Sequence, residues 1–340
     1  MLAITLLTGC QAKSELYWFE DEKGIYNYCP TIMKDNDKIH VWYCSNRNPY
    51  TIIDYIAYRS IDLSKEDAKW TDKAYALTPT EGEWDSLHDC DPTVVKGEFT
   101  YKEMEYSYAM FYLGCVNPHC KMNHVGLAFS KSIDGPWVKW KDKPFIAYDG
   151  SPEFWGVGQP CAISLDQKGQ IALFYTRGDE TATGMWVQVI DLTNADEPAI
   201  KETVALTTEG LTSIDGSDAI LHNGALAYDE EENRYYMVRP RHPFDGLTPG
   251  YIASQLQIAS IDGDDLLSGK GTWEVIGHVT KEDTDFPRNH NAAILRDAYG
   301  YVDAKGGLDV IYTVSKLGDS SLWSYRLKDI HIPVEVEDER

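Results

Sequence analysis

Five apolar and aromatic runs of four or five residues recur along the chain, at residues 39–43, 108–112, 171–175, 235–238 and 308–312. They are too short for helices and are bounded by turn residues, so they predict β-strands. A second apolar run follows each of them, at residues 55–58, 125–129, 186–190, 256–260 and 322–325. Weaker runs near Trp70 and at residues 137–140, 204–206, 273–276 and 330–336 predict one more strand in each unit. We predict no helix.

The segment before each first run also repeats. The five copies are Cys29-Pro30-Thr31-Ile32, Asp91-Pro92-Thr93-Val94, Gln159-Pro160-Cys161-Ala162, Asn223-Gly224-Ala225-Leu226 and Asn291-Ala292-Ala293-Ile294. Their first positions differ by 62, 68, 64 and 68 residues, which indicates a structural repeat. Five units of four short antiparallel strands predict an all-β, five-bladed β-propeller with the first strand of each blade at the axis. A many-stranded sandwich would not explain a first-strand pattern that returns five times.

The first ten residues form an apolar run that ends in Leu7-Thr8-Gly9-Cys10, which resembles the bacterial lipobox. We therefore predict that residues 1–10 are a lipoprotein signal segment, 11–23 a linker and 24–340 a single propeller domain. In this interpretation Cys10 carries a lipid that holds the protein at a membrane, in the periplasm or on the cell surface. No Lys or Arg precedes the run, and a frayed first strand is the alternative.

Charge and cysteine content narrow the partners. The net charge of -23 repels phosphate backbones, so we exclude nucleic acid as a partner. Cys115 and Cys120 bracket a loop, and an oxidising compartment would allow them to pair. No cysteine spacing is typical of a zinc site. Five of the six cysteines after Cys10 lie in or beside apolar runs and are predicted to be buried thiols: Cys29, Cys44, Cys90, Cys115 and Cys161.

The meander geometry predicts where a site lies. In an antiparallel blade, strand 1 begins at the same end as the loop between strands 2 and 3. The first-strand residues therefore converge on the axis at that end: Cys29, Asp91, Gln159, Asn223 and Asn291. Asp89 is two residues before Asp91 and is predicted on the same pleat face. His222 and His290 directly precede the two asparagines.

The predicted loops at this end carry arginines and aromatic residues. Arg177, Arg239 and Arg241 are candidate substrate-binding residues, and Arg288 is a further arginine that could face the same pocket. Planar guanidinium groups bind carboxylate and sulfate in a bidentate manner, which predicts an anionic glycan. The alternative is that each arginine pairs with a neighbouring carboxylate on a solvated loop. Trp155 is a candidate platform for stacking on a sugar ring.

The Asp91-Pro92 opening of a blade, the recurrent runs of the Phe-Tyr type and Gly135-Pro136-Trp137 make residues 24–336 similar to five-bladed glycoside hydrolases related to family 43. The resemblance implies inverting hydrolysis by two carboxyl groups, with a third carboxylate that tunes the acid. In the family the base Asp opens blade 1, the tuning Asp opens blade 2 and the acid Glu opens blade 3. Only Asp91 matches; Cys29 and Gln159 stand at the other two positions.

Two functional hypotheses follow from this departure. In the first, the protein is a glycosidase with a relocated acid and base, in which Asp91 acts together with Glu153 or His290 as the proton donor. The wider pool of acids and bases is Asp89, Asp179, Glu180, Asp218 and His222. In the second, the protein is a non-catalytic carbohydrate-binding lipoprotein. Both make a carbohydrate the partner and need no cofactor, and His290 leaves open a structural metal ion in the axial channel.

Overall fold

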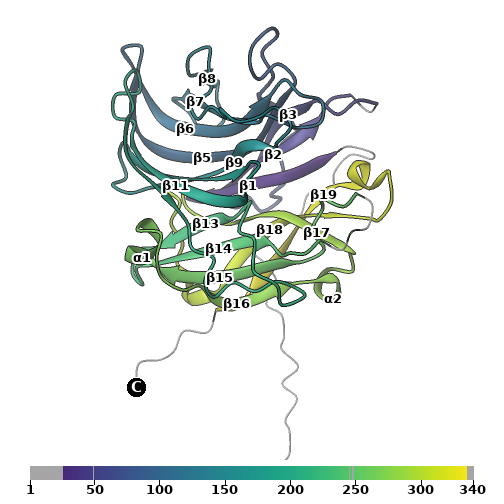
Figure 1. Cartoon of the computed structure of the whole chain (residues 1–340). Coiled ribbons are helices and arrows are strands. Elements are labelled where there is room, and N and C mark those ends of the chain that lie inside the picture. The colour runs from purple at the N-terminus through teal and green to yellow at the C-terminus, as the bar shows by residue number, and fades with distance from the viewer. Residues whose placement is uncertain (1–25, 49, 245, 247–248, 335–340) are drawn as a thin grey trace, which may run out of the picture.

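The computed structural model describes residues 26–334 except 49, 245 and 247–248. Its strands form five antiparallel sheets that follow one another around a ring, from purple to yellow in Figure 1. The first strand of each sheet contacts the first strand of the next, and the first strand of the last sheet contacts that of the first. The ring is therefore closed, and the predicted five-bladed propeller is confirmed.

Within every blade the strands follow the chain order as a meander. They are β1 (Asn27–Asp35), β2 (Lys38–Asn46), β3 (Asp54–Asp62) and β4 (Ala74–Leu77) in blade 1; β5 (His88–Tyr101), β6 (Met104–Cys115), β7 (His124–Ser130) and β8 (Val138–Lys139) in blade 2; β9 (Gly156–Ser164), β10 (Gln170–Gly178), β11 (Thr183–Asp191) and β12 (Ala199–Ala205) in blade 3; β13 (Ala225–Asp229), β14 (Arg234–Pro240), β15 (Leu256–Asp262) and β16 (Glu274–Val279) in blade 4; β17 (Arg288–Ile294), β18 (Leu308–Ser315) and β19 (Arg326–Ile332) in the described part of blade 5.

The core is divided among the blade interfaces. One cluster of buried apolar side chains fills each of the five interfaces, including the one between blades 5 and 1. Neighbouring blades thus cover both faces of each sheet. In β2, for example, every residue from Ile39 to Asn46 is buried. This is why the second strands have continuous apolar runs in place of an alternating pattern.

Two local predictions are wrong: the run at residues 322–325 is not a strand, and the described residues include short helices. The run 322–325, predicted as a third strand, is the 3-10 helix η2 (Ser321–Ser324), and the third strand is β19, which overlaps the predicted fourth strand at 330–336. A four-residue apolar run is too short for its periodicity to distinguish a strand from a helical turn. The structure also has the 3-10 helix η1 (Ala304–Gly306) and two one-turn helices, α1 (Gly263–Leu267) and α2 (Lys281–Thr284).

The predicted signal segment and linker, including Cys10, lie outside the described residues. Among the residues that are described, no helix is long and apolar enough to span a membrane. The lipid anchor therefore stays a prediction.

Candidate active site

The five first-strand residues occupy equivalent positions at the axis, and we call them the axial ring: Cys29, Asp91, Gln159, Asn223 and Asn291. All five have a positive φ, between 36° and 50°. Strand pairing is irregular beside the ring residues of blades 1, 2, 3 and 5. In these four blades the bulge turns the side chain of the ring residue out of its sheet. Backbone strain repeated at five equivalent positions is typical of a functional site.

The preceding blade holds the backbone of several ring residues in place. The Cys29 amide donates to Thr313 Oγ1 at 3.2 Å, and the Asn223 amide donates to Thr176 Oγ1 at 2.8 Å. At the equivalent point the Asp91 amide lies 2.9 Å from Sγ of Cys44. In each case the acceptor belongs to the second strand of the blade before, so neighbouring blades together fix the ring.

The ring side chains also contact one another. The Cys29 thiol hydrogen-bonds with Asp91 and Asn291, and Asn223 Nδ2 donates to Asn291 Oδ1. Gln159 Oε1 is buried without a hydrogen-bond partner. An unpaired buried acceptor is costly, which makes this amide a candidate for binding a ligand hydroxyl group.

A cavity of about 30 Å³ continues from the ring along the first strands. This volume suits a few water molecules, whereas ligand pockets typically measure about 300–1,000 Å³. The Arg296 guanidinium lies in this cavity and donates to the Leu226 carbonyl at 2.8 Å and to Thr93 Oγ1 at 2.9 Å. Its positive charge disfavours the structural metal ion considered for the channel. A sugar would have to bind at the face above the ring, which is the end of the propeller where the first strands begin.

Asp91 has the ionisation behaviour of an acid–base group. It is 6% exposed, and burial raises its pKa to about 7; the hydrogen bond from Cys29 lowers the pKa and the charge of Asp54 raises it. A carboxyl group that is half protonated at neutral pH can donate or accept a proton there. Burial also raises the pKa of the Cys29 thiol well above its ordinary value, so Cys29 stays protonated.

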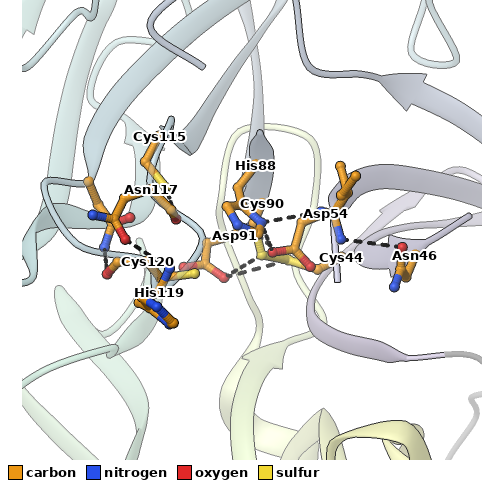
Figure 2. A network of polar contacts seen from close by, with 12 residues as sticks. Cys44, Asn46, Asp54, His88, Cys90, Asp91, Cys115, Asn117, His119 and Cys120 are labelled. Atoms are coloured by element: carbon orange, nitrogen blue, oxygen red, sulfur yellow. Dashed lines mark hydrogen bonds and ion pairs between the residues drawn. A yellow bond between two sulfur atoms is a disulfide. The ribbon is translucent and has the colours of Figure 1, made fainter. Parts of the chain in front are cut away.

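A disulfide between Cys44 of β2 and Cys90 of β5 joins blades 1 and 2 beside Asp91 (Figure 2). The nearer sulfur, Cys90 Sγ, lies 3.1 Å from Asp91 Oδ1. The prediction of buried free thiols is therefore wrong for these two cysteines and confirmed for Cys29, Cys115 and Cys161. The two half-cystines are 46 residues apart on different blades, and nothing local in the sequence pairs them.

Asp89 does not share the pleat face of Asp91, because the bulge after Cys90 interrupts the alternation. Its carboxylate lies 2.8 Å from Lys139 Nζ, which also contacts Asp85 at 2.6 Å. Burial raises the pKa of Asp89 well above its ordinary value, and the charge of Lys139 opposes this effect. Asp89 is thus part of an internal ion network of blade 2, and the structure gives it no place in the axial ring.

His290 is buried next to the ring, where its Nδ1 accepts a hydrogen bond of 3.1 Å from the Ala253 amide. Burial, together with the charges of Arg288 and His242, lowers its pKa to about 3. The imidazole of His290 is therefore neutral at pH 7, with its proton on Nε2. In this state His290 can donate a hydrogen bond to a sugar oxygen but is a weak general acid.

Glu153 and Trp155 precede β9 in one loop but differ in environment. The Glu153 side chain is 78% exposed and pairs with Lys121 at 3.1 Å. Trp155 is half-buried and packs with Tyr28 against the cluster formed by Cys29, the disulfide and Leu113. Trp155 is thus beside the axial ring, as a sugar platform would need to be, while the carboxylate of Glu153 is held at the surface.

The candidate arginines already have protein partners. Arg239 is 1% exposed and donates to Gln257 Oε1 and to the carbonyls of Thr212, Ile220 and Pro240. Arg241 donates to Thr212, Ser213 and Gln255, and Arg288 donates to the Ile252 and Pro249 carbonyls. Arg177 pairs with Asp179 at 2.8 Å and with Asp149 at 3.5 Å. These internal partners account for the arginines without an anionic glycan.

Sequence reasoning missed Asp54 and His88, which form a buried pair at 2.7 Å between β3 and β5 (Figure 2). Burial by itself lowers the pKa of His88, but the hydrogen bond and charge of Asp54 outweigh it and the pKa is raised. It also missed Tyr28, whose Oη lies 2.8 Å from Cys90 Sγ. The one sequence signal for these three residues is that each lies at or next to the first residue of a strand.

No family model matches the sequence, and no curated protein sequence matches it. The endo-arabinase from Bacteroides thetaiotaomicron VPI-5482 has a similar structure, with a TM-score of 0.57 at 14% identity, over 92% of this chain and 95% of that protein. The fold is that of five-bladed glycoside hydrolases. A family 117 glycoside hydrolase from the marine bacterium Zobellia galactanivorans gives a TM-score of 0.60 at 14% identity, over 96% of this chain and 91% of the other. A thermostable family-43 glycoside hydrolase gives 0.58 at 15% identity, over 92% and 91%.

Proposed function

We propose that the protein is a glycoside hydrolase that cleaves an oligosaccharide at the face above the axial ring, with Asp91 as the general acid. The observation that carries this proposal is the position of Asp91: a buried carboxyl group with a pKa of about 7, in a ring of hydrogen-bonding side chains at the axis. The similarity to solved glycoside hydrolases over nearly the whole chain supports it at the level of the fold.

In this proposal the protonated fraction of Asp91 donates its proton to the leaving oxygen of the glycosidic bond while water attacks the sugar ring. The amides of Gln159, Asn223 and Asn291 bind sugar hydroxyl groups, and the indole of Trp155 stacks on a sugar face. Activation of the water needs an ionised carboxylate. That carboxylate would accept the proton that the attacking water loses. Asp179 is not assigned this role, because hydrogen bonds from Thr181 and Arg177 hold its pKa below its usual range, which makes it a weak base.

The alternative is a sugar-binding propeller that does not hydrolyse its ligand. It is favoured by Cys29 and Gln159, because a thiol with a raised pKa and an amide cannot act as the base and acid that the family 43 resemblance implies at these positions. Binding without turnover, measured for the unmutated protein over a broad set of oligosaccharides, would establish this alternative.

The pH dependence of hydrolysis tests the role of Asp91. We expect kcat/KM to fall as pH rises through about 7, because the carboxyl group loses the proton that it must donate. The measurement is kcat/KM between pH 4 and pH 9 at constant ionic strength. A rate that stays level or rises across pH 7 would exclude Asp91 as the acid.

We also propose that the protein is exported and held at a membrane through a lipid on Cys10. The disulfide supports export, because disulfides persist in oxidising compartments. In a bacterial host expressing the full natural precursor, Cys10→Ala is expected to shift the protein from the membrane fraction to the soluble fraction. Unchanged membrane association of this variant would exclude the anchor.

A further inference from the structure

Three side chains that can bind a metal gather at the end of blade 2, and we call them the His88 cluster: His88, Cys115 and Cys120. A ring nitrogen of His88 and the two sulfur atoms all lie within 4.8 Å of one another. His88 and Cys115 are directly paired between β5 and β6, so their side chains share one face of the sheet. Cys120 is brought to them by the loop after β6, in which its amide donates to the Asn117 carbonyl at 3.0 Å (Figure 2).

The histidine is oriented as a metal ligand would be. Its Nδ1 lies 2.7 Å from Asp54 Oδ2, and both side chains are 1% exposed. A proton shared with this carboxylate belongs on Nδ1, which leaves the lone pair on Nε2. That Nε2 atom is buried and has no hydrogen-bond partner. A carboxylate that orients a histidine through the nitrogen opposite the metal is the usual arrangement around protein-bound zinc.

We propose that the His88 cluster is a Zn²⁺ site in which His88 Nε2 and the thiolates of Cys115 and Cys120 are the protein ligands. Thiolate and imidazole together favour zinc over magnesium or calcium, which prefer oxygen ligands. Three protein ligands leave the fourth tetrahedral position for water or another ligand. Cys115 is buried whereas Cys120 is partly exposed, so solvent has access from the side of Cys120.

The other cysteine group near the axis cannot bind zinc in the same way. Cys44 and Cys90 lie beside Asp91, but their sulfur atoms are bonded to each other. Cys115 and Cys120 remain free thiols in the same structure. Within the part of the chain that the structure describes, the His88 cluster is therefore the group of this kind that has free thiols.

Zinc at this position would fix one wall of the candidate active site. The loop that carries Cys120 continues to Met122 and Asn123, whose amides donate to the Phe154 and Trp155 carbonyls at 3.0 and 2.9 Å. A metal that holds the loop thus also holds the backbone of Trp155. This role does not depend on whether the protein hydrolyses its sugar.

The test is the metal content of the full chain, expressed with zinc and purified without chelators. We expect one zinc per chain by mass spectrometry, a loss of at least ten-fold in Cys120→Ser, and no loss in Cys161→Ser, which removes a buried free thiol outside the cluster. Asp54→Asn is expected to retain the ligands but to weaken zinc affinity by about 10- to 100-fold. In the unmutated protein, Co²⁺ is expected to give sulfur-to-metal charge-transfer bands and the visible spectrum of a four-coordinate site.

Three results would overturn the proposal. They are a Cys115–Cys120 disulfide in the isolated protein that persists after reduction and reoxidation with zinc, full zinc content in Cys120→Ser, and a Co²⁺ spectrum without charge-transfer bands. The cobalt spectrum uses the unmutated chain, so the test holds even if a variant fails to fold. Because none of these readouts involves a sugar, failure of the zinc site and failure of the proposed hydrolase are distinguishable.

Discussion

Asp91→Asn is expected to lower kcat by about 10²- to 10⁴-fold while oligosaccharide affinity changes only a few-fold. The asparagine amide has nearly the shape of the carboxyl group and can still hydrogen-bond to a sugar and to the axial ring residues. It has no proton to transfer at neutral pH. The measurement is the rate of hydrolysis of an oligosaccharide that the unmutated protein cleaves, with binding followed by calorimetry.

Matched variants separate chemistry from folding. Asp91→Asn removes a carboxyl group whose ionisation is opposed by burial, so the variant should be at least as stable as the unmutated protein at pH 7. Asp89→Asn changes a carboxylate in the ion network of blade 2. This variant is expected to lower the stability of the protein but to leave kcat and oligosaccharide affinity nearly unchanged. Glu153→Gln and His290→Gln test the other two nominated donors. Full activity in Asp91→Asn would contradict the proposed mechanism.

Removal of the disulfide is expected to have the largest effect on stability. Its half-cystines are 46 residues apart, and the entropy of closing a loop of this length corresponds to about 4 kcal/mol in the chain-entropy description. The double variant Cys44→Ala and Cys90→Ala should therefore lose about 2–4 kcal/mol of unfolding free energy, measured by denaturant titration under conditions where unfolding is reversible.

The control for this experiment is Cys161→Ser, which keeps the disulfide. The double variant should also lower the turnover rate, because the bond packs beside Asp91 and joins the two blades that hold it. Equal stability of the double variant and the unmutated protein would show that the bond is absent or contributes nothing in solution.

The sequence alone was sufficient for the architecture and for the axial ring. The repeat at Cys29, Asp91, Gln159, Asn223 and Asn291 predicted five blades, and each first strand begins within three residues of the predicted position. The second strands of all blades and the third strands of blades 1 to 4 were also predicted correctly. These features depend on local apolar runs, and the same pattern appears five times, so one ambiguous unit does not change the inference. Blade 5, where a four-residue run became η2, shows how weak a single copy is.

The chemistry of the site was decided by tertiary contacts. The bulge at Asp91 turns Asp89 toward Lys139, and no pattern in the sequence marks where a strand changes its alternation. The buried environment that raises the pKa of Asp91 to about 7 comes from several blades at once.

Pairings between residues far apart in the chain were equally inaccessible to the sequence. The Cys44–Cys90 bond and the Asp54–His88 hydrogen bond each join blade 1 to blade 2, and Arg239 of β14 donates to the carbonyls of Thr212 and Ile220 in the segment between β12 and β13. A sequence specifies which residue types are available, whereas the closure of the ring decides which of them meet. Local patterns therefore determined the propeller and the position of its axis, and only packing between blades determined which groups are free to act there.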